Sequence, residues 1–165
     1  MSAEISGRLT RVRPATDEDA DLLVAWHADP DVSRYWDGET FTRDEVLERL
    51  RRTDVDSYVV EAEGEPVGFI EAWREDDESL RGGLDMFLVP PARGRGLGPD
   101  AARSLAEVLV ASGWTRVTAD PYTWNESAIR AWRRAGFVDV ETRRADDEHT
   151  SPWLLMEFQS ASGSS

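Results

Sequence analysis

Apolar and polar positions alternate along some stretches of this chain and follow a helical spacing along others. Alternation predicts strands at 8–13, 57–62, 67–73, 84–89, 116–120, 137–142 and 152–158. Apolar positions spaced three and four residues apart predict helices at 16–27, from 42 onward, at 99–112 and at 125–136. The resulting order, β-α-α-β-β-β-α-β-α-β-β, predicts an α/β (α+β) fold with a mixed, partly antiparallel central sheet and helices on both faces.

Capping and turn residues mark the ends of these elements. Threonine with an acid three residues later opens a helix twice, asparagine opens another, and glycine suits the position just after a helix. These residues are Thr16 with Asp19, Thr42 with Glu45, Asn125, Gly113 and Gly136. The Gly and Pro within 63–66 predict a hairpin turn, and 29–39 is expected to be a loop.

The length and composition bound the kind of protein. A chain of 165 residues fits one domain, which we place at 1–159, and the small polar residues of 160–165 predict a disordered tail. The absence of cysteine excludes disulfide scaffolds, thiolate zinc sites and cysteine nucleophiles, and no metal is expected. The chain has neither a long apolar run nor the basic and apolar regions of a signal peptide, so a cytoplasmic location is expected.

The net charge narrows the choice of partners. A formal charge of -14 repels phosphate backbones and anionic membrane surfaces, so neither nucleic acid nor a membrane is expected as a partner. The same charge attracts cations to an acidic cleft. Charge alone also fits a role in solubility only.

The segment 88–98 carries the strongest chemical signal. Gly94, Gly96 and Gly98 lie between a predicted strand and the clearest predicted helix, with two arginines among them. Glycines allow close backbone approach to a ligand, and the N-terminus of the helix presents free N–H groups to an anion. The spacing matches neither a Walker loop nor the dinucleotide pattern Gly-x-Gly-x-x-Gly. A flexible turn is the plain alternative, and the arginines favour a phosphate site.

Arg93-x-x-Gly96-x-Gly98 resembles the pyrophosphate-binding motif of the GNAT superfamily of N-acetyltransferases. The order of elements agrees with that superfamily along nearly the whole chain. A closer similarity is to the aminoglycoside 6′-N-acetyltransferases, carried by Gly83-Leu84-Asp85, Thr118-Ala119-Asp120-Pro121 and the segment 125–137. The resemblance implies that acetyl-CoA is the co-substrate and that a cationic amine, foremost the 6′-amine of an aminoglycoside, attacks the thioester directly in a ternary complex.

The resemblance also assigns roles to individual residues. The coenzyme would be bound by Phe87, Leu88, Val89, Arg93, Gly94, Arg95, Gly96, Leu97, Gly98 and Asn125. The catalytic groups would be Asp85, Asp120 and the N–H of Leu88, which polarises the thioester carbonyl. The acceptor would contact Tyr35, Trp36, Asp37, Glu71, Asp85 and Asp120.

Other residues depart from that pattern or stand outside it. Pro99 stands where many relatives have a residue with an N–H and a hydroxyl, and Trp132 stands where many have a tyrosine that protonates the leaving thiolate. His27 and His149 have no partner of ligand type at a telling spacing and are interpreted as structural or surface residues. For Trp26, on an apolar helix face, a place in the core is expected.

Three alternatives stay open at this point. The acceptor could be a protein N-terminus, as in ribosomal-protein acetyltransferases, or a siderophore precursor such as a hydroxylated lysine. The protein could also be a non-catalytic acyl-CoA sensor, which the tryptophan at 132 favours. The chain is expected to be a monomer or a homodimer.

Overall fold

The computed structural model describes residues 4–76, 78 and 80–160. Its strands are β1 (Ile5–Ser6), β2 (Arg11–Pro14), β3 (Val55–Ala62), β4 (Glu65–Arg74), β5 (Arg81–Leu88), β6 (Arg116–Ala119), β7 (Phe137–Arg143) and β8 (Trp153–Phe158). Its α-helices are α1 (Ala20–Ala28), α2 (Pro30–Ser33), α3 (Arg43–Leu50), α4 (Leu97–Ala111) and α5 (Glu126–Ala135), with short 3-10 helices η1 (Asp17–Asp19) and η2 (Pro90–Ala92).

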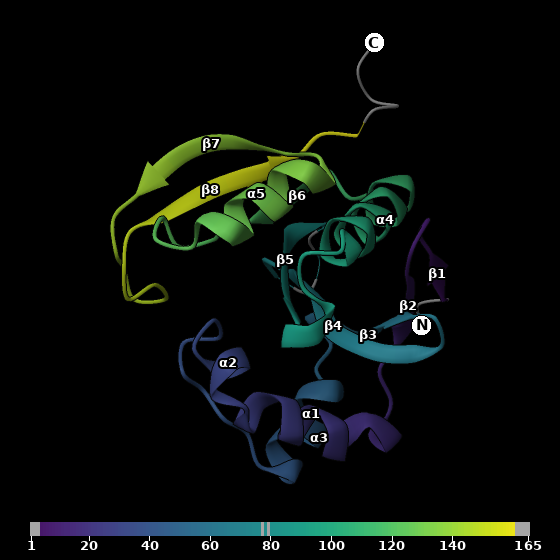
Figure 1. Ribbon diagram of the computed structural model, residues 1–165. Helices are drawn as coiled ribbons and strands as arrows, with labels where there is room; N and C mark the ends of the chain where they lie inside the picture. Colours follow the sequence, from purple (N-terminus) through teal and green to yellow (C-terminus); the bar gives the residue numbers. More distant parts are fainter. Residues whose placement is uncertain (1–3, 77, 79, 161–165) are drawn as a thin grey trace.

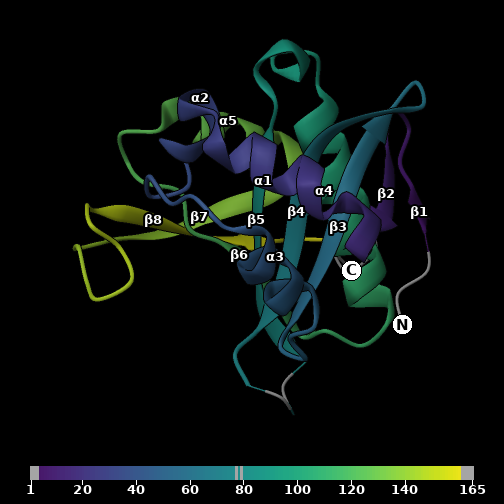
Figure 2. The same cartoon turned by 90° about the horizontal axis from the view of Figure 1, so that it is seen from below.

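The strands form one sheet in the order β1-β2-β3-β4-β5-β6-β8-β7. Neighbouring strands are antiparallel except β5 and β6, which are parallel and are joined by the crossover helix α4. Figure 2 shows β7 and β8 running at a steep angle to β3 and β4, as expected of a strongly twisted sheet. The predicted mixed, partly antiparallel sheet is confirmed.

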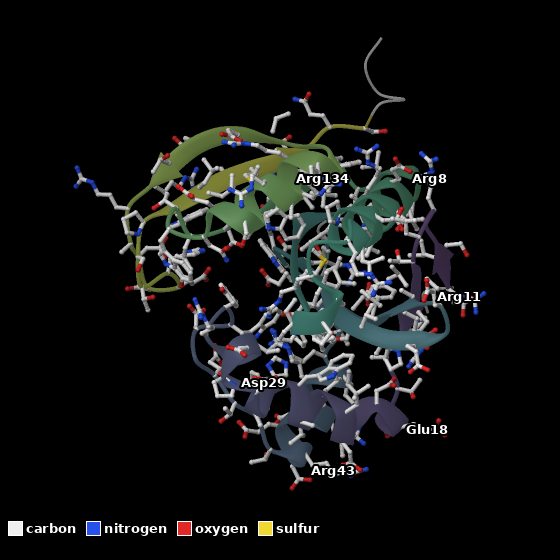
Figure 3. The ribbon with its side chains drawn as sticks, viewed as in Figure 1. Arg8, Arg11, Glu18, Asp29, Arg43 and Arg134 are labelled. Atoms are coloured by element: carbon white, nitrogen blue, oxygen red, sulfur yellow. The ribbon has the colours of Figure 1, made fainter. Side chains whose placement is uncertain are left out.

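Helices cover both faces of the sheet, as predicted (Figure 1). On one face α4 and α5 bury a core that includes Leu105, Ile70 and Phe137. On the other face α1, α2 and α3 bury a smaller core around Phe69 and Phe87. Figure 3 shows the side chains of Glu18 and Arg43 extending outward from this smaller helical layer. Each helix therefore turns its apolar side to the sheet.

Two segments differ from the sequence prediction. The strand expected at 8–13 begins only at Arg11, and the residues before it form the turn between β1 and β2. The turn is held by the carboxylate of Asp100, which accepts hydrogen bonds from the N–H groups of Arg8, Leu9 and Thr10 and from the Thr10 hydroxyl. Those donors are no longer available to a neighbouring strand, so β1 and β2 end on either side of the turn. The expected loop at 29–39 contains α2, which is capped by the carboxylate of Asp29.

The expected helix ends are confirmed by the hydrogen bonds that define them. Thr42 Oγ1 accepts from the N–H of Glu45, and Glu45 Oε1 accepts from the N–H of Thr42. Asp19 accepts from the N–H of Thr16, although the first turn there is the 3-10 helix η1. Asn125 caps α5, which ends at Gly136 in the left-handed conformation. The start and end of these helices are thus encoded locally.

Two further expectations concern the surroundings of the domain. None of the helices within residues 4–76, 78 and 80–160 has both the length and the apolar character needed to cross a membrane. The tail predicted at 160–165 lies outside the described residues from 161 onward. The domain bounds at 1–159 stay a prediction.

Candidate functional site

The sheet opens between β5 and β6. The two strands pair only from Arg81 to Gly83 on β5, while Thr118 and Ala119 of β6 pair with β8 on the other edge of that strand. Gly83 is tightly enclosed, since a Cβ there would lie 2.5 Å from the ring of Trp73 and 2.8 Å from Thr118 Oγ1. The glycine allows the strands to meet closely on one side of the opening, and from Leu84 onward β5 has a free edge.

A cleft of about 570 Å³ lies at this opening and extends to the helical layer of α3. Its walls come from the α2–α3 loop, α3, β4, β5, the β6–α5 loop, α5 and the β7–β8 loop. Its acidic lining residues are Asp37, Glu39, Asp54, Glu71, Glu75, Asp85, Asp120 and Glu148. The arginines in the lining are Arg49, Arg52 and Arg74. The excess of carboxylates over guanidinium groups makes this cleft attractive to cations.

The free edge of β5 presents backbone groups to the opening. The N–H of Val89 donates to the carbonyl of Val67, toward β4. Because successive residues of a strand direct their backbone groups to opposite edges, the N–H of Leu88 is directed to the free edge. The side chain of Phe87 packs into the smaller core. The backbone around Leu88 can therefore hydrogen-bond an extended ligand as an added strand would.

The glycine loop that follows β5 has the conformation an anion cradle needs. Gly94 and Gly96 have φ values of 76° and 78°, in the left-handed region that favours glycine. Gly96 is the N-cap of α4, so the first N–H groups of that helix are directed at the loop. A Cβ at Gly98 would lie 3.3 Å from Met86 Cε, which leaves little room for any larger residue. These features fit a bound phosphate group.

The Arg93 side chain holds the glycine loop in place through hydrogen bonds to β5 and α2. Its Nε donates to the carbonyl of Leu88, and its Nη2 donates to the carbonyl of Asp31 at 2.8 Å. Its guanidinium also lies 5.2 Å from the centre of the Tyr35 ring. The side chain of Arg93 therefore positions the loop against α2, and the loop's contribution to anion binding falls to its backbone and to Arg95.

Two carboxylates lie opposite each other on β4 and β5. Glu71 and Asp85 are cross-strand partners, and their side chains share the sheet face that α3 covers. Glu71 is 1% exposed, and both of its oxygens accept from Arg49. Burial together with the charges of Asp120 and Glu71 raises the pKa of Asp85 well above its ordinary value, although Arg49 opposes the rise. Asp85 thus has the environment of a proton acceptor rather than of a surface carboxylate.

The second predicted catalytic carboxylate, Asp120, follows β6. Its Oδ2 lies 2.7 Å from Nε2 of His149, and the other ring nitrogen lies 2.9 Å from Oδ1 of Asp146. His149 is buried and lines the cleft, so its interpretation as a mere structural or surface residue missed its place in the site. Asp120 and His149 are 29 residues apart, and no local spacing in the sequence could have joined them.

Aromatic side chains form the rim of the cleft. Tyr35 stacks on Trp124, and Trp124 stacks on Tyr122. The hydroxyl of Tyr122 donates to Oδ1 of Asp37, which connects the α2–α3 loop to the β6–α5 loop. Asp37 itself is in the left-handed region, with φ 56°. Tyr35 and Asp37 therefore lie at the rim of the cleft, and their contact with an acceptor stays a prediction.

Trp36 and Trp132 each pack into a core and also line the cleft. Trp36 packs against Phe69 and Phe87 while it also lines the cleft. Trp132 is buried against Phe137 and presents part of its surface to the cleft. Trp26 packs edge-on against Phe87, which agrees with its expected place in the smaller core.

Asn125 combines two expected features. Its Oδ1 accepts the N–H of Ala128 as the cap of α5, and the residue also lines the cleft. Within the described residues there is no group of three or more metal-binding side chains. The cleft is thus built from backbone donors, carboxylates and aromatic rings.

The family described as "Acetyltransferase (GNAT) domain" matches residues 9–138, which is most of the chain. The chain belongs to the GNAT acetyltransferase family. The resemblance to this family is thereby confirmed, and the motif Arg93-x-x-Gly96-x-Gly98 that carried it lies in the glycine loop at the start of α4 of this acetyltransferase.

Individual relatives point in the same direction. The aminoglycoside N(6′)-acetyltransferase type 1 of Klebsiella pneumoniae is 28% identical over 145 residues, covering 76% of this chain and 72% of the relative. The protein of the same name from Serratia marcescens is similar to the same extent.

Solved structures agree with the fold. AAC(6′)-Ib in complex with ribostamycin and coenzyme A is 26% identical, with a TM-score of 0.79 over 92% of this chain and 93% of that one. The spermidine N-acetyltransferase of Vibrio cholerae, in complex with CoA and spermine, has a TM-score of 0.78 at 14% identity over 91% of this chain and 95% of that one. At that identity the second likeness concerns the fold alone.

Proposed function

We propose that this acetyltransferase transfers the acetyl group of acetyl-CoA to an amine of a cationic small molecule, foremost the 6′-amine of an aminoglycoside. The observation that carries the proposal is the position of Asp85 and Asp120 in an acidic cleft beside the free edge at Leu88. The 28% identity to aminoglycoside N(6′)-acetyltransferases supports the choice of acceptor. Because an aminoglycoside carries several ammonium groups, it would neutralise a cleft of this charge.

The residues around the opening fit the coenzyme. Acetyl-CoA supplies the acetyl thioester. The loop from Gly94 to Gly98 and the N-terminus of α4 would bind its pyrophosphate, since the left-handed glycines aim backbone N–H groups at one point. The backbone of Phe87, Leu88 and Val89 would hold the pantetheine arm along the free edge, with Asn125 on the opposite side of the cleft. Leu97 contributes its N–H, whereas Pro99 has none to contribute.

The two aspartates would divide the work on the acceptor. An ammonium must lose a proton before its nitrogen can attack, so the site needs a proton acceptor and a group that holds the cation. Asp85, whose pKa is raised, suits the first role, because a cation bound beside it drives its ionisation and leaves it a competent base. Asp120, facing His149, suits the second. Two carboxylates in different environments commonly take different roles in this way.

The remaining chemistry concerns the thioester. The N–H of Leu88 would donate to the thioester carbonyl and stabilise the charge that develops on its oxygen. The indole of Trp132 is not an acid, so protonation of the leaving thiol falls to water in the open cleft. As the resemblance to the family implies, the acceptor amine would attack the thioester directly in a ternary complex.

The shape of the cleft favours a small cation over the other acceptors. A peptide acceptor would call for a longer open groove with fewer carboxylates, whereas the contact of Tyr122 with Asp37 closes this cleft at its rim. A neutral hydroxylated precursor would leave the excess of carboxylates over guanidinium groups in the lining without a cationic partner. A polycationic amine satisfies both features.

Release of free coenzyme A tests the proposal. The purified protein is assayed with acetyl-CoA and kanamycin, spermine, a ribosomal N-terminal peptide or N-hydroxylysine, each in turn. Turnover with kanamycin, with the added acetyl group located on the 6′-nitrogen by NMR, supports the proposal. Turnover with spermine alone would change the acceptor, turnover with the peptide alone would contradict a small-molecule acceptor, and acetyl-CoA binding without any turnover would favour the non-catalytic sensor.

A further inference from the structure

The imidazole of His149 lies between two carboxylates. Its Nε2 is 2.7 Å from Asp120 Oδ2 on the cleft side, and its Nδ1 is 2.9 Å from Asp146 Oδ1 on the outer side. The side chain of His149 is 10% exposed. The ring stacks on Trp153, with ring centres 4.1 Å apart, and Tyr122 packs edge-on against it. Its position is therefore set from four directions.

Asp146 is held in place independently of the ring. It accepts from the backbone N–H groups of Glu148 and His149 and from Nε1 of Trp153. These contacts fold the β7–β8 loop, at the left of Figure 1, into a turn that carries His149 back to the cleft. Because these hydrogen bonds hold the loop, the imidazole has a fixed position beside Asp120.

The geometry determines which form of histidine fits. Ionised carboxylates only accept hydrogen bonds, and a neutral imidazole has one donor and one acceptor nitrogen. Only the imidazolium can donate to Asp120 and Asp146 at once. Burial disfavours the charge, but the hydrogen bonds with both carboxylates raise the pKa of His149 above its ordinary value. The other titratable or charged groups on the surrounding elements include Tyr122, Glu148, Arg143, Arg144, Asp147 and, through Tyr122, Asp37.

We infer that His149 is a positioning residue for the reaction: as an imidazolium anchored by Asp146, it holds the Asp120 carboxylate oriented toward the bound acceptor cation. This inference rests on the proposed function. It separates the roles of the two site carboxylates: Asp120 pairs with His149, and the task of taking the proton is left to Asp85. His149 itself does not contact the acceptor nitrogen and transfers no proton.

The test compares His149→Gln with Asp147→Asn. Glutamine can keep a neutral N–H near the position of Nε2 but cannot carry the charge, and Asp147 is an exposed carboxylate of the same loop. We expect His149→Gln to lower kcat roughly tenfold to a hundredfold, the scale of one hydrogen bond to an ionised group, with acetyl-CoA affinity unchanged. The acid limb of the pH–rate profile should move to higher pH. The charge of Asp120 raises the pKa of Asp85, and the imidazolium would no longer offset that charge. Asp147→Asn should leave kcat and the pH–rate profile unchanged.

A double-mutant cycle identifies the group through which His149 acts. If it acts through Asp120, the pair Asp120→Asn with His149→Gln loses no more turnover than Asp120→Asn alone. Additive losses would overturn the inference. Equal kcat and equal pH profiles for His149→Gln and the parent protein, in a preparation that turns over, would overturn it as well.

An NMR titration decides the same point without turnover. The imidazole of His149 should stay protonated on both nitrogens to a higher pH than an ordinary histidine, and Asp120→Asn should move the titration to lower pH, while Asp147→Asn should not. If Asp120→Asn left the titration of His149 unchanged, the pairing of His149 with Asp120 would be overturned whether or not the enzyme is active. A parent protein that acetylates none of the four acceptors would overturn the proposed function and the catalytic part of this inference, with the pairing judged by the titration alone.

Discussion

Glu71 and Asp85 face each other across β4 and β5, and only Glu71 is bound by the guanidinium of Arg49. The ion pair neutralises the buried carboxylate of Glu71, whereas Asp85 lines the cleft beside Asp120. The cation of Arg49 thus neutralises Glu71 and leaves a second, less neutralised carboxylate, Asp85, at the point where the sheet opens. Four predictions follow from this arrangement and its surroundings.

Asp85→Asn should remove the proposed proton acceptor. Asparagine is nearly the same size and cannot take a proton from an ammonium, so we expect kcat to fall roughly a hundredfold or more. Acetyl-CoA affinity should stay unchanged, because the glycine loop and the free edge of β5 are intact. Steady-state kinetics and calorimetric titration with acetyl-CoA measure the two effects, with Asp147→Asn as the control. Equal kinetics for Asp85→Asn and the parent would remove Asp85 from the mechanism.

Glu71→Gln should change the pH dependence in the direction opposite to His149→Gln. The charge of Glu71 contributes to the raised pKa of Asp85, and its removal leaves Arg49 free to stabilise the ionised form. The pKa of Asp85 should fall, and the acid limb of the pH–rate profile should move to lower pH. Leaving Arg49 without its buried partner should also cost about 3 kcal/mol of unfolding free energy. An acid limb that moves upward would contradict the coupling.

Gly96→Ala should weaken acetyl-CoA binding through backbone strain. A Cβ at Gly96 meets nothing closer than 3.6 Å, so the cost arises from its φ of 78°, roughly 1–2 kcal/mol for a residue other than glycine. Relief of that strain would turn the N–H groups of the loop away from the phosphate site. Gly64→Ala is the matched control, because Gly64 has φ 79° and open space around it in the β3–β4 turn.

Both variants should lose similar thermal stability, and only Gly96→Ala should lose acetyl-CoA affinity. Differential scanning calorimetry and titration calorimetry give the two quantities. If Gly64→Ala weakened acetyl-CoA binding equally, the loss would reflect general destabilisation rather than the cradle.

His27 should make folding stability depend on pH below neutrality. Burial among aromatic rings, together with the nearby charge of Arg49, lowers the pKa of His27 to about 4 from 6.5. The unfolded chain therefore takes up a proton that the folded protein refuses between pH 6.5 and 4, and stability falls as the pH drops through that window. The change is on the order of 3 kcal/mol. His27→Phe should flatten urea-denaturation stability across this range, and an undiminished slope would contradict the assignment.

Local features of the fold are readable from the sequence because they depend on neighbouring residues. The caps at Thr42 and Asn125 satisfy donors three residues away, and Gly94 and Gly96 adopt backbone angles that other residues avoid. Alternation and helical spacing located most strands and helices. The turn at Arg8 to Thr10 could not be found in this way, because its partner, Asp100, is about 90 residues further along the chain.

By itself, then, the sequence determined most of the order of elements, the helix ends, the glycine loop and the acidic character of the protein. Tertiary structure alone decided which charged groups meet: Arg49 with Glu71, Glu71 opposite Asp85, and His149 with Asp120. The physical reason is that periodicity and backbone preference act over a few residues. Contacts between distant side chains instead depend on strand register, on the splay that begins after Gly83, and on how a loop folds back.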